Sequence, residues 1–413
     1  MSNAHCSRGR PPSRAWPAVA TAVALGTACG TPAPVTVSLS HPVTVPVEIY
    51  HNRVYLPARI DNSSLVAVVL DNGASVSGVR DSVARALGIR SSRRATLLGN
   101  GRSTLSIELA DDVTFDVGGA AVREPFVAIL PYDEFARHEG RLNAGVLGKD
   151  TYARFVVDVD YAAHTLTLRD PSTFTYSGSG IVIPLHVRRD ARSAWMAARI
   201  TVPGSGPVDA RLGLDMGTYS ALRLYSPFVK RRALLGAASG TVATYGFGLG
   251  GEFPIRLMRV DSLAIGNLRL RGPVAELSTA DSGATAREDV DGTIGGAILS
   301  RFRVIVDYAH ARMILEPNPH TDAPYVADMS GLVLDASGPG FATITVGHVL
   351  PTSPAFEAGF AVGDQLVSID GDGVDRLGLA RVRALLMRQA AYHITVARGS
   401  LPIELVLRTR PMI

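Results

Sequence analysis

The segment at residues 144–171 reads AGVLGKDTYARFVVDVDYAAHTLTLRDP, and residues 291–318 repeat its pattern as DGTIGGAILSRFRVIVDYAHARMILEPN. Identical residues recur at one constant spacing, beginning with Gly145 and Gly292. Ungapped agreement over such a length indicates a duplicated unit. The chain therefore contains two related halves, and a functional residue in one half should have a counterpart in the other.

An aspartate that directly follows an apolar strand occurs in both halves. Residues 68–80, VVLDNGASVSGVR, place Asp71 directly after a strand, and residues 210–224, ARLGLDMGTYSALRL, place Asp215 in the same position. A single Asp-x-Gly sequence is ordinary turn chemistry and predicts only a turn. Two such turns at corresponding places in a duplicated chain form a specific pair. Each half later closes with an apolar sequence that ends in glycine, at Gly148 and Gly295.

Composition restricts the class of protein. With 413 residues, 46% of them hydrophobic, the chain has material for two or three globular domains. The net charge of +4 is spread along the chain without a dense basic run, so we expect no nucleic-acid partner. The signatures HExxH, CxxC and GxxxxGKS/T do not occur, and we expect no metal or other cofactor.

The N-terminus has the composition of an export signal. A basic start precedes AWPAVATAVALGTA, an apolar run of 14 residues that is too short for a stable membrane span. GTAC, which overlaps the end of this run and finishes at Cys29, resembles a bacterial lipoprotein cleavage box, although Gly26 stands where leucine is usual. Cleavage near Ala28 without lipidation is the alternative. We predict a signal at residues 1–29 and an exported protein, in the periplasm or lipid-anchored to the outer membrane or cell envelope.

Both halves are predicted to be rich in β-strands, with short apolar or alternating runs such as VTVPVEIY at residues 43–50. SVARALGI, residues 82–89, predicts a short helix that ends at Gly88. Two glycine-rich hairpins could act as flaps, with the candidate residues Gly99, Asn100, Gly101, Tyr245, Gly246 and Gly248. The Tyr245 ring would either line a cleft or serve in packing.

The pattern changes after about residue 320. A run of SPA at 353–355, AG at 358–359, GD at 363–364 and IDG at 369–371, followed by a helical stretch and two strands, closely resembles a bacterial PDZ domain. In such domains backbone N–H groups capture a chain end, and an exposed strand edge pairs with a peptide. The resemblance implies that this role falls to Gly331, Leu332, Val333 and Leu334.

The paired aspartate turns resemble those of the pepsin and retropepsin class of aspartic proteases. With the PDZ-like segment, residues 43–413 resemble bacterial aspartyl proteases that carry such a domain. The resemblance implies a catalytic dyad of Asp71 and Asp215. It also implies that the two turns are formed and backed by Asn72, Gly73, Ala74, Met216, Gly217, Thr218, Gly148 and Gly295.

The chemistry of such a dyad follows from charge repulsion. Two neighbouring carboxylates cannot both ionise cheaply, so they share a proton and one pKa rises; aspartic proteases are the standard example. The ionised member polarises a water molecule for attack on a peptide carbonyl, and the protonated member donates to the carbonyl oxygen. Two hairpins that act as flaps would exclude water and clamp an extended substrate.

The sequence departs from the family pattern beside both aspartates. The family usually has Thr or Ser there, and its hydroxyl braces one turn against the other, whereas this chain has Asn72 and Met216. A thioether is only a weak hydrogen-bond acceptor. Losing a buried brace costs roughly 1 kcal/mol. A weakly active or inactive peptide-binding lipoprotein is therefore the alternative to an active peptidase.

These observations predict a mostly β protein with two retropepsin-like β-barrel lobes of about six strands each and a C-terminal PDZ-like α+β domain. The expected bounds are a linker at 30–42, lobes at 43–172 and 180–318, and the PDZ-like domain at 325–413. The expected function is aspartic endopeptidase. Its partners would be polypeptide substrates and, at the PDZ-like domain, protein C-termini. Because both aspartates lie in one chain, we expect a monomer whose only membrane contact is a lipid on Cys29.

Overall fold

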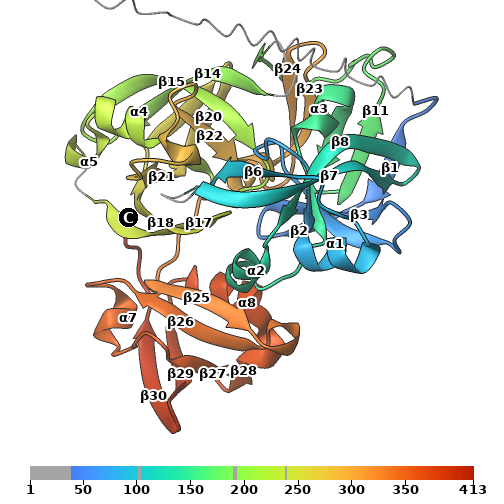
Figure 1. Ribbon diagram of the computed structural model, residues 1–413. Coiled ribbons are helices and arrows are strands. Elements are labelled where there is room, and N and C mark those ends of the chain that lie inside the picture. The colour runs from blue at the N-terminus through green and yellow to red at the C-terminus, as the bar shows by residue number, and fades with distance from the viewer. Residues whose placement is uncertain (1–38, 101–103, 189–192, 238–239) are drawn as a thin grey trace, which may run out of the picture. The chain divides into compact units, whose positions relative to one another are not determined.

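The computed structural model describes residues 39–100, 104–188, 193–237 and 240–413, which Figure 1 draws in colour. The predicted signal, Cys29, the first part of the predicted linker and Gly101 lie outside the described residues. Within the described ranges, every helix is too short or too polar to span a bilayer.

The first half of the chain folds into an eight-stranded sheet, here called the N-terminal sheet. Its long β7–β8 hairpin adds strands beyond the six that the sequence predicts. Helix α1 ends at Gly88, as predicted, because that glycine adopts a left-handed φ of 70°. The sheet order is β2 (Glu48–Tyr50), β3 (Arg53–Ile60), β4 (Val66–Leu70), β9 (Gly145–Leu147), β5 (Gly78–Arg80), β8 (Ala120–Leu130), β7 (Thr104–Val117) and β6 (Arg93–Leu98). Its helices are α1 (Asp81–Leu87), α2 (Asp133–Glu139) and α3 (Lys149–Arg154).

The second half forms a ten-stranded sheet, here called the second sheet, again larger than predicted. Its order is β17 (Val242–Gly248), β18 (Gly251–Arg259), β21 (Val274–Ser278), β16 (Leu222–Leu224), β22 (Gly292–Gly295), β15 (Gly206–Asp215), β14 (Ala194–Val202), β19 (Ser262–Ile265) and β20 (Leu268–Arg271), with β13 (His186–Val187) beside β14. Its helices are α4 (Ser226–Arg231), α5 (Leu234–Ala237), α6 (Gly296–Leu299) and the 3₁₀ turn η1 (Ala284–Ala286). The parallel pairing of β4 with β9 recurs here as the pairing of β15 with β22.

A six-stranded sheet joins the two copies of the repeat, in the order β1 (Val43–Pro46), β11 (Thr165–Arg169), β10 (Val156–Asp160), β23 (Phe302–Asp307), β24 (Arg312–Pro317) and β12 (Ile181–Pro184). At its centre β10 and β23 run antiparallel, with Val157 opposite Val306 and Val159 opposite Val304. Because Val304 and Val306 are the repeat counterparts of Val157 and Val159, the two copies meet symmetrically, as equivalent surfaces do across a two-fold axis.

The strands after residue 330 have a hydrophobic core of their own, which includes Leu334, Ile344, Val382 and Ile394; residues 332–408 are here called the C-terminal unit. Its strands are β25 (Leu332–Ser337), β26 (Thr343–Val349), β27 (Gln365–Ile369), β29 (Ala391–Arg398) and β30 (Leu401–Arg408), in that order, with β28 (Asp372–Gly373) beside β27. Its helices are α7 (Pro354–Glu357), α8 (Val374–Leu386) and the 3₁₀ turn η2 (Pro339–Phe341). Strand β25 lies at the sheet edge.

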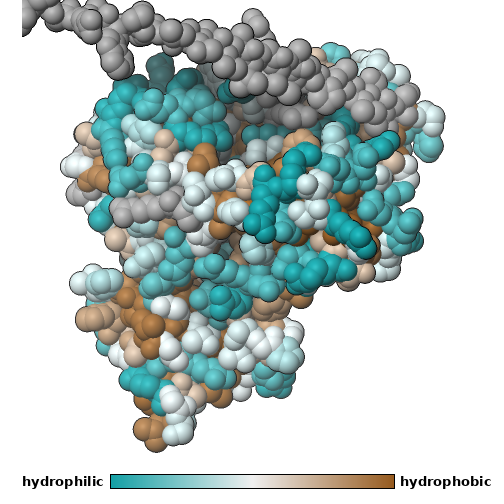
Figure 2. Space-filling model, in the orientation of Figure 1, coloured by the Kyte–Doolittle hydropathy of each residue, from teal (hydrophilic) through white to brown (hydrophobic). Residues whose placement is uncertain are grey.

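The structure confirms the predicted mostly β architecture. The surface is mixed, and Figure 2 shows brown, hydrophobic residues gathered on the C-terminal unit. Exposed apolar side chains of that unit include Phe356, Val362 and Leu401.

Candidate active site

Asp71 and Asp215 approach each other across two glycine turns. A methyl group on Gly73 would lie 2.7 Å from Oδ1 of Asp215 and 2.9 Å from Oδ1 of Asp71. A methyl group on Gly217 would lie 2.3 Å from Oδ2 of Asp71. Each turn therefore faces the aspartate of the other half, and only glycine leaves room for the two carboxylates to meet.

Backbone hydrogen bonds hold Asp71 at the end of β4. Its N–H donates to the carbonyl of Leu147 over 2.9 Å, which continues the parallel pairing with β9. Its Oδ1 accepts the N–H groups of Gly73, at 2.7 Å, and Ala74, at 3.2 Å. Asp215 occupies the matching position at the end of β15, opposite Gly295 in β22. In both halves, therefore, the aspartate stands at the end of a strand that pairs in parallel with the strand of the later glycine motif.

The two later glycines lie directly behind the turns. A methyl group on Gly148 would lie 3.0 Å from the carbonyl oxygen of Ala74, and one on Gly295 would lie 2.4 Å from Cγ2 of Thr218. A side chain at either position would push the turn forward. The Thr218 hydroxyl itself is turned to Ser220, with the two hydroxyl oxygens 3.1 Å apart.

Asn72 and Met216 stand where the proteases that the sequence resembles usually carry Thr or Ser, and here they form a brace between the two turns, called the rebuilt brace. The N–H of Met216 donates to Oδ1 of Asn72 over 2.9 Å. The hydroxyl of Tyr152 donates to the Met216 sulfur over 3.0 Å. Met216 is fully buried, and its side chain belongs to the hydrophobic core. Asn72 and Met216 therefore link the halves through one backbone donor and one sulfur acceptor in place of two hydroxyls.

A buried arginine adds a second connection that sequence reasoning missed. Arg53, at the start of β3, donates from Nε to the carbonyl of Gly217 over 2.6 Å and pairs through Nη1 with Glu139 of α2. Arg53 is 3% exposed and Glu139 is 1% exposed. The only sequence signal was one charged residue at the head of the apolar strand RVYLPARI, which does not reveal its partners.

A second buried ion pair flanks Asp215. Nε of Arg223 lies 2.7 Å from Oε2 of Glu276, and both side chains are 4% exposed. The sequence predicted no role for either residue, because they come from strands β16 and β21, far apart along the chain. The guanidinium groups of Arg53 and Arg223 both act electrostatically on Asp215.

The carboxylates titrate as an interacting pair. Burial, and then the nearby charge of Asp215, raise the pKa of Asp71 to about 7. Burial also raises the pKa of Asp215, whereas Arg223 and Arg53 oppose this rise. The pair therefore retains one proton up to near-neutral pH, with the positive side chains favouring the ionised form of Asp215.

A cavity of about 440 Å³ lies over the pair, and both hairpins contribute to it. The N–H of Asn100 in the first hairpin donates to the carbonyl of Leu249 in the second over 3.0 Å, so the hairpins meet. Besides both aspartates, the lining includes Asn100, Tyr132, Phe135, Phe247, Gly248 and Leu249. In the described ranges, no three His, Cys, Asp or Glu side chains are grouped so that they could hold a metal ion.

Several predicted flap and loop residues lie elsewhere. Tyr245 is not among the residues that line the dyad cavity; its ring stacks on His348 of the C-terminal unit and borders a second cavity. Gly246 lies against the ring of Phe253, where a methyl group would come within 2.6 Å of a ring carbon. Gly99 accepts the N–H of Ala284 over 2.8 Å. Leu332, Val333 and Leu334 begin β25, after Gly331, and line a different cavity.

Two aspartates thus converge from glycine turns at equivalent positions of the repeat. In a comparison with protein families, residues 56–151 match the family model described as Aspartyl protease. This match includes Asp71 and its turn. No curated protein matches the chain.

Proposed function

We propose that the protein is an aspartic endopeptidase whose dyad is Asp71 and Asp215. The observation that carries the proposal is that each carboxylate lies against the glycine of the opposite turn, beneath a cavity of about 440 Å³. The family match of residues 56–151 supports aspartyl protease function in general.

The proposed reaction uses one shared proton. The ionised carboxylate of Asp215 takes a proton from water as the water oxygen attacks the peptide carbonyl carbon, and Asp71 gives its proton to the carbonyl oxygen. In the resulting gem-diol, Asp215 returns its proton to the peptide nitrogen as the carbon–nitrogen bond breaks. Asp71 recovers its proton from the diol. Atoms balance, and the pair ends in its starting state.

The rebuilt brace supports activity over the alternative of an inactive peptide-binding protein. The Met216 N–H bond to Asn72 and the Arg53 bond to Gly217 both cross between the halves at the turns. Catalytic geometry must be held to a fraction of an ångström, because small displacements of reacting groups cost large factors in rate. These two hydrogen bonds between the turns restrain the positions of the aspartates.

The C-terminal unit would bind polypeptide ends in the manner of a PDZ domain. Support comes from the edge position of β25 and from α8, which packs on the same sheet. An edge strand beside a helix can accept an extended peptide as an additional strand. This unit would recruit substrates to the dyad.

Substitution of each aspartate tests the peptidase proposal. Asp71→Asn and Asp215→Asn should each lower cleavage of a labelled, denatured protein substrate by about 10⁴-fold or more, because the proposed reaction needs both carboxyl groups and the loss of either one removes most of the catalysis. Asp209→Asn is the matched control, because Asp209 lies on the same strand β15 and is 70% exposed. Cleavage that persists in either dyad variant, with circular dichroism unchanged, would refute the assignment.

A further inference from the structure

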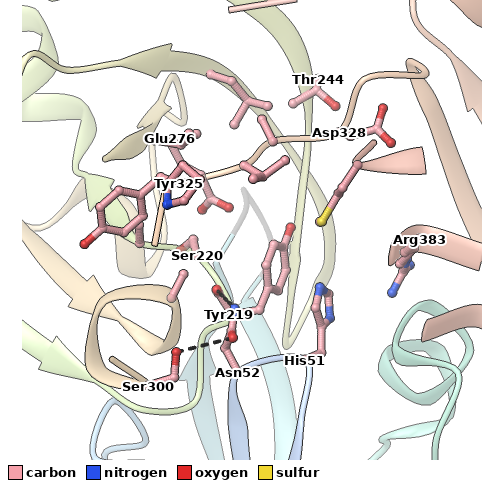
Figure 3. Close-up of a pocket in the computed structure, with 18 of the residues that line it drawn as sticks. His51, Asn52, Tyr219, Ser220, Thr244, Glu276, Ser300, Tyr325, Asp328 and Arg383 are labelled. Carbon is pink, nitrogen blue, oxygen red and sulfur yellow. Dashed lines mark hydrogen bonds between the residues drawn. The ribbon is translucent and has the colours of Figure 1, made fainter. Parts of the chain in front are cut away.

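The two halves that carry Asp71 and Asp215 are here called the catalytic part. A second cavity, of about 580 Å³, lies between this part and the C-terminal unit. Figure 3 shows Arg383 and Asp328 on one side of it and Tyr325 and Glu276 on the other, with Tyr219 between them. Most of its lining is apolar, and it reaches the surface, because the lining residues Tyr245 and Val326 are 37% and 44% exposed. Cavities of this size and polarity are typical of ligand sites.

The loop that precedes β25 has little free hydrogen-bonding capacity. The N–H groups of Ser330 and Gly331 donate to Oδ1 of Asp328 over 2.9 and 2.6 Å. The N–H of Leu332 donates to the Ser330 hydroxyl over 3.0 Å. These amides are the ones that a PDZ-like loop would offer to a chain end. A carboxylate that enters this cavity therefore needs a different donor.

Arg383 of α8 is that donor. Its Nη2 donates to the carbonyls of His138 and Leu334, over 2.7 and 2.9 Å, and no carboxylate of the described residues forms an ion pair with it. Burial lowers the pKa of Arg383, which reflects a cation held away from water. A guanidinium carries five N–H donors, so Nε and Nη1 remain for a ligand. A cation left without an anion on an apolar cavity favours an anionic ligand.

The acidic residues around this cavity are already engaged. Glu276 is paired with Arg223, and the Asp328 carboxylate accepts the loop amides described above. Close to Arg383, Glu139 is paired with Arg53, and Asp335 lies 3.3 Å from Nδ1 of His138. Arg301, also in the lining, is directed to backbone carbonyls. Arg383 is therefore the charged group with donors to spare.

One wall of the cavity belongs to the catalytic hairpin. Thr244, Tyr245, Ile255 and Leu257, from β17 and β18, line this cavity, whereas the tip of the same hairpin, residues 247–249, lines the cavity over the dyad. A ligand in the second cavity would thus lie against the base of the hairpin that covers the catalytic aspartates.

Helix α2 limits how much chain can enter. It packs beside β25, where the His138 carbonyl shares the Nη2 group of Arg383 with Leu334. Just after the helix, a methyl group on Gly140 would lie 3.0 Å from Leu379 of α8. The far part of the groove between β25 and α8 is therefore covered by the catalytic part, which leaves room for a chain end only.

We propose that this cavity binds the C-terminal end of a polypeptide, with its carboxylate on Arg383 and its apolar last side chains against the base of hairpin β17–β18. The inference rests on the proposed peptide-binding role of the C-terminal unit and adds the anchor and the second wall. Occupancy of the cavity is thereby linked to the hairpin over the dyad.

Peptide binding to the full chain tests the anchor. The probe is a set of labelled hexapeptides that differ only in the last residue, each prepared as a free acid and as a C-terminal amide. Measurements use the Asp71→Asn variant, so that no probe is cleaved. Acids with an apolar last residue should bind about tenfold tighter than their amides, as a charge-assisted hydrogen bond implies. Equal binding of acids and amides across the set would overturn the proposal without any further variant.

Variants on α8 locate the carboxylate. Arg383→Met should reduce acid binding to the level of the amides, and Arg383→Lys should retain part of the preference. Arg381→Met is the matched control, because Arg381 is exposed on the same helix. An unchanged acid preference in a folded Arg383→Met variant would place the carboxylate elsewhere.

Hydrogen exchange tests the shared wall. The best-binding acid should slow amide exchange in residues 242–259 as well as in β25, and protection confined to residues 325–413 would refute the shared cavity. Both readouts use a variant without dyad activity. Failure here, with wild-type protein still cleaving substrate, would reject the chain-end site alone, whereas binding without cleavage would reject only the peptidase proposal.

Discussion

Replacing Arg53 with methionine should destabilise the protein and slow the proposed reaction. Methionine keeps the length and apolar character of the side chain but removes both polar contacts, the Nε–H bond to Gly217 and the ion pair with Glu139. Glu139 would remain 1% exposed, with the His51 ring nitrogen 3.6 Å away and the Arg383 guanidinium acting on it electrostatically. A buried carboxylate without its cation is the costly product of this substitution.

The magnitude can be estimated in two ways. Burial alone raises the pKa of Glu139, but Arg53 and then His51 overcome this and lower it from 4.5 to about 2, which corresponds to about 3 kcal/mol. Removing one partner of a buried ion pair typically costs about 3–5 kcal/mol. We therefore expect Arg53→Met to lower the free energy of unfolding by about 3 kcal/mol. Displacement of the Gly217 turn should lower the turnover rate by about 10²-fold.

Urea unfolding at pH 7 and substrate turnover measure the two effects. Arg59→Met is the control, because Arg59 is exposed on the same strand β3 and its Nη1 donates to the Ser63 carbonyl. The double variant Arg53→Met, Glu139→Leu should recover most of the stability but not the activity, since it removes the stranded charge without restoring the bond to Gly217. A loss below about 1 kcal/mol in the single variant would contradict the assignment of Glu139 as an ionised, arginine-dependent carboxylate.

Four further outcomes are expected. Gly217→Ala should abolish turnover, because its methyl group would lie 2.3 Å from Oδ2 of Asp71, and normal turnover in the folded variant would show that the turn can move aside. Tyr152→Phe should lower thermal stability by roughly 1 kcal/mol through loss of the bond to the Met216 sulfur, and an unchanged midpoint would mean that this contact contributes nothing. Activity should fall as pH rises through about 7, where the pair around Asp71 loses its shared proton, and a constant rate up to pH 9 would contradict a proton-sharing pair. The lowered pKa of Glu139 stabilises the fold fully above about pH 4.5, and this stability should disappear as pH falls toward 2; Glu139→Gln should flatten that dependence in urea titrations.

The sequence alone determined the mostly β architecture, the duplication and the pairing of two aspartate turns. The duplication can be detected in the sequence because Gly145 and its neighbours recur, without gaps, at Gly292 and its neighbours. Strand periodicity and turn glycines are local signals, since they depend on a side chain and its near neighbours. The helix that ends at Gly88 is of the same kind, because one left-handed residue suffices to end it.

Only the tertiary structure decided how the turns are held and what surrounds them. The Arg53 bond to Gly217, the Tyr152 contact with Met216 and the pairing of Arg223 with Glu276 join residues that are distant in the chain. A buried charge is tolerated only where a partner of opposite sign lies beside it. Here the partner belongs to a distant strand or helix, so no local pattern in the sequence predicts the pair. The side chain of Tyr245 illustrates the same limit, because its hairpin was predictable but its stacking on His348 depends on how separate units pack.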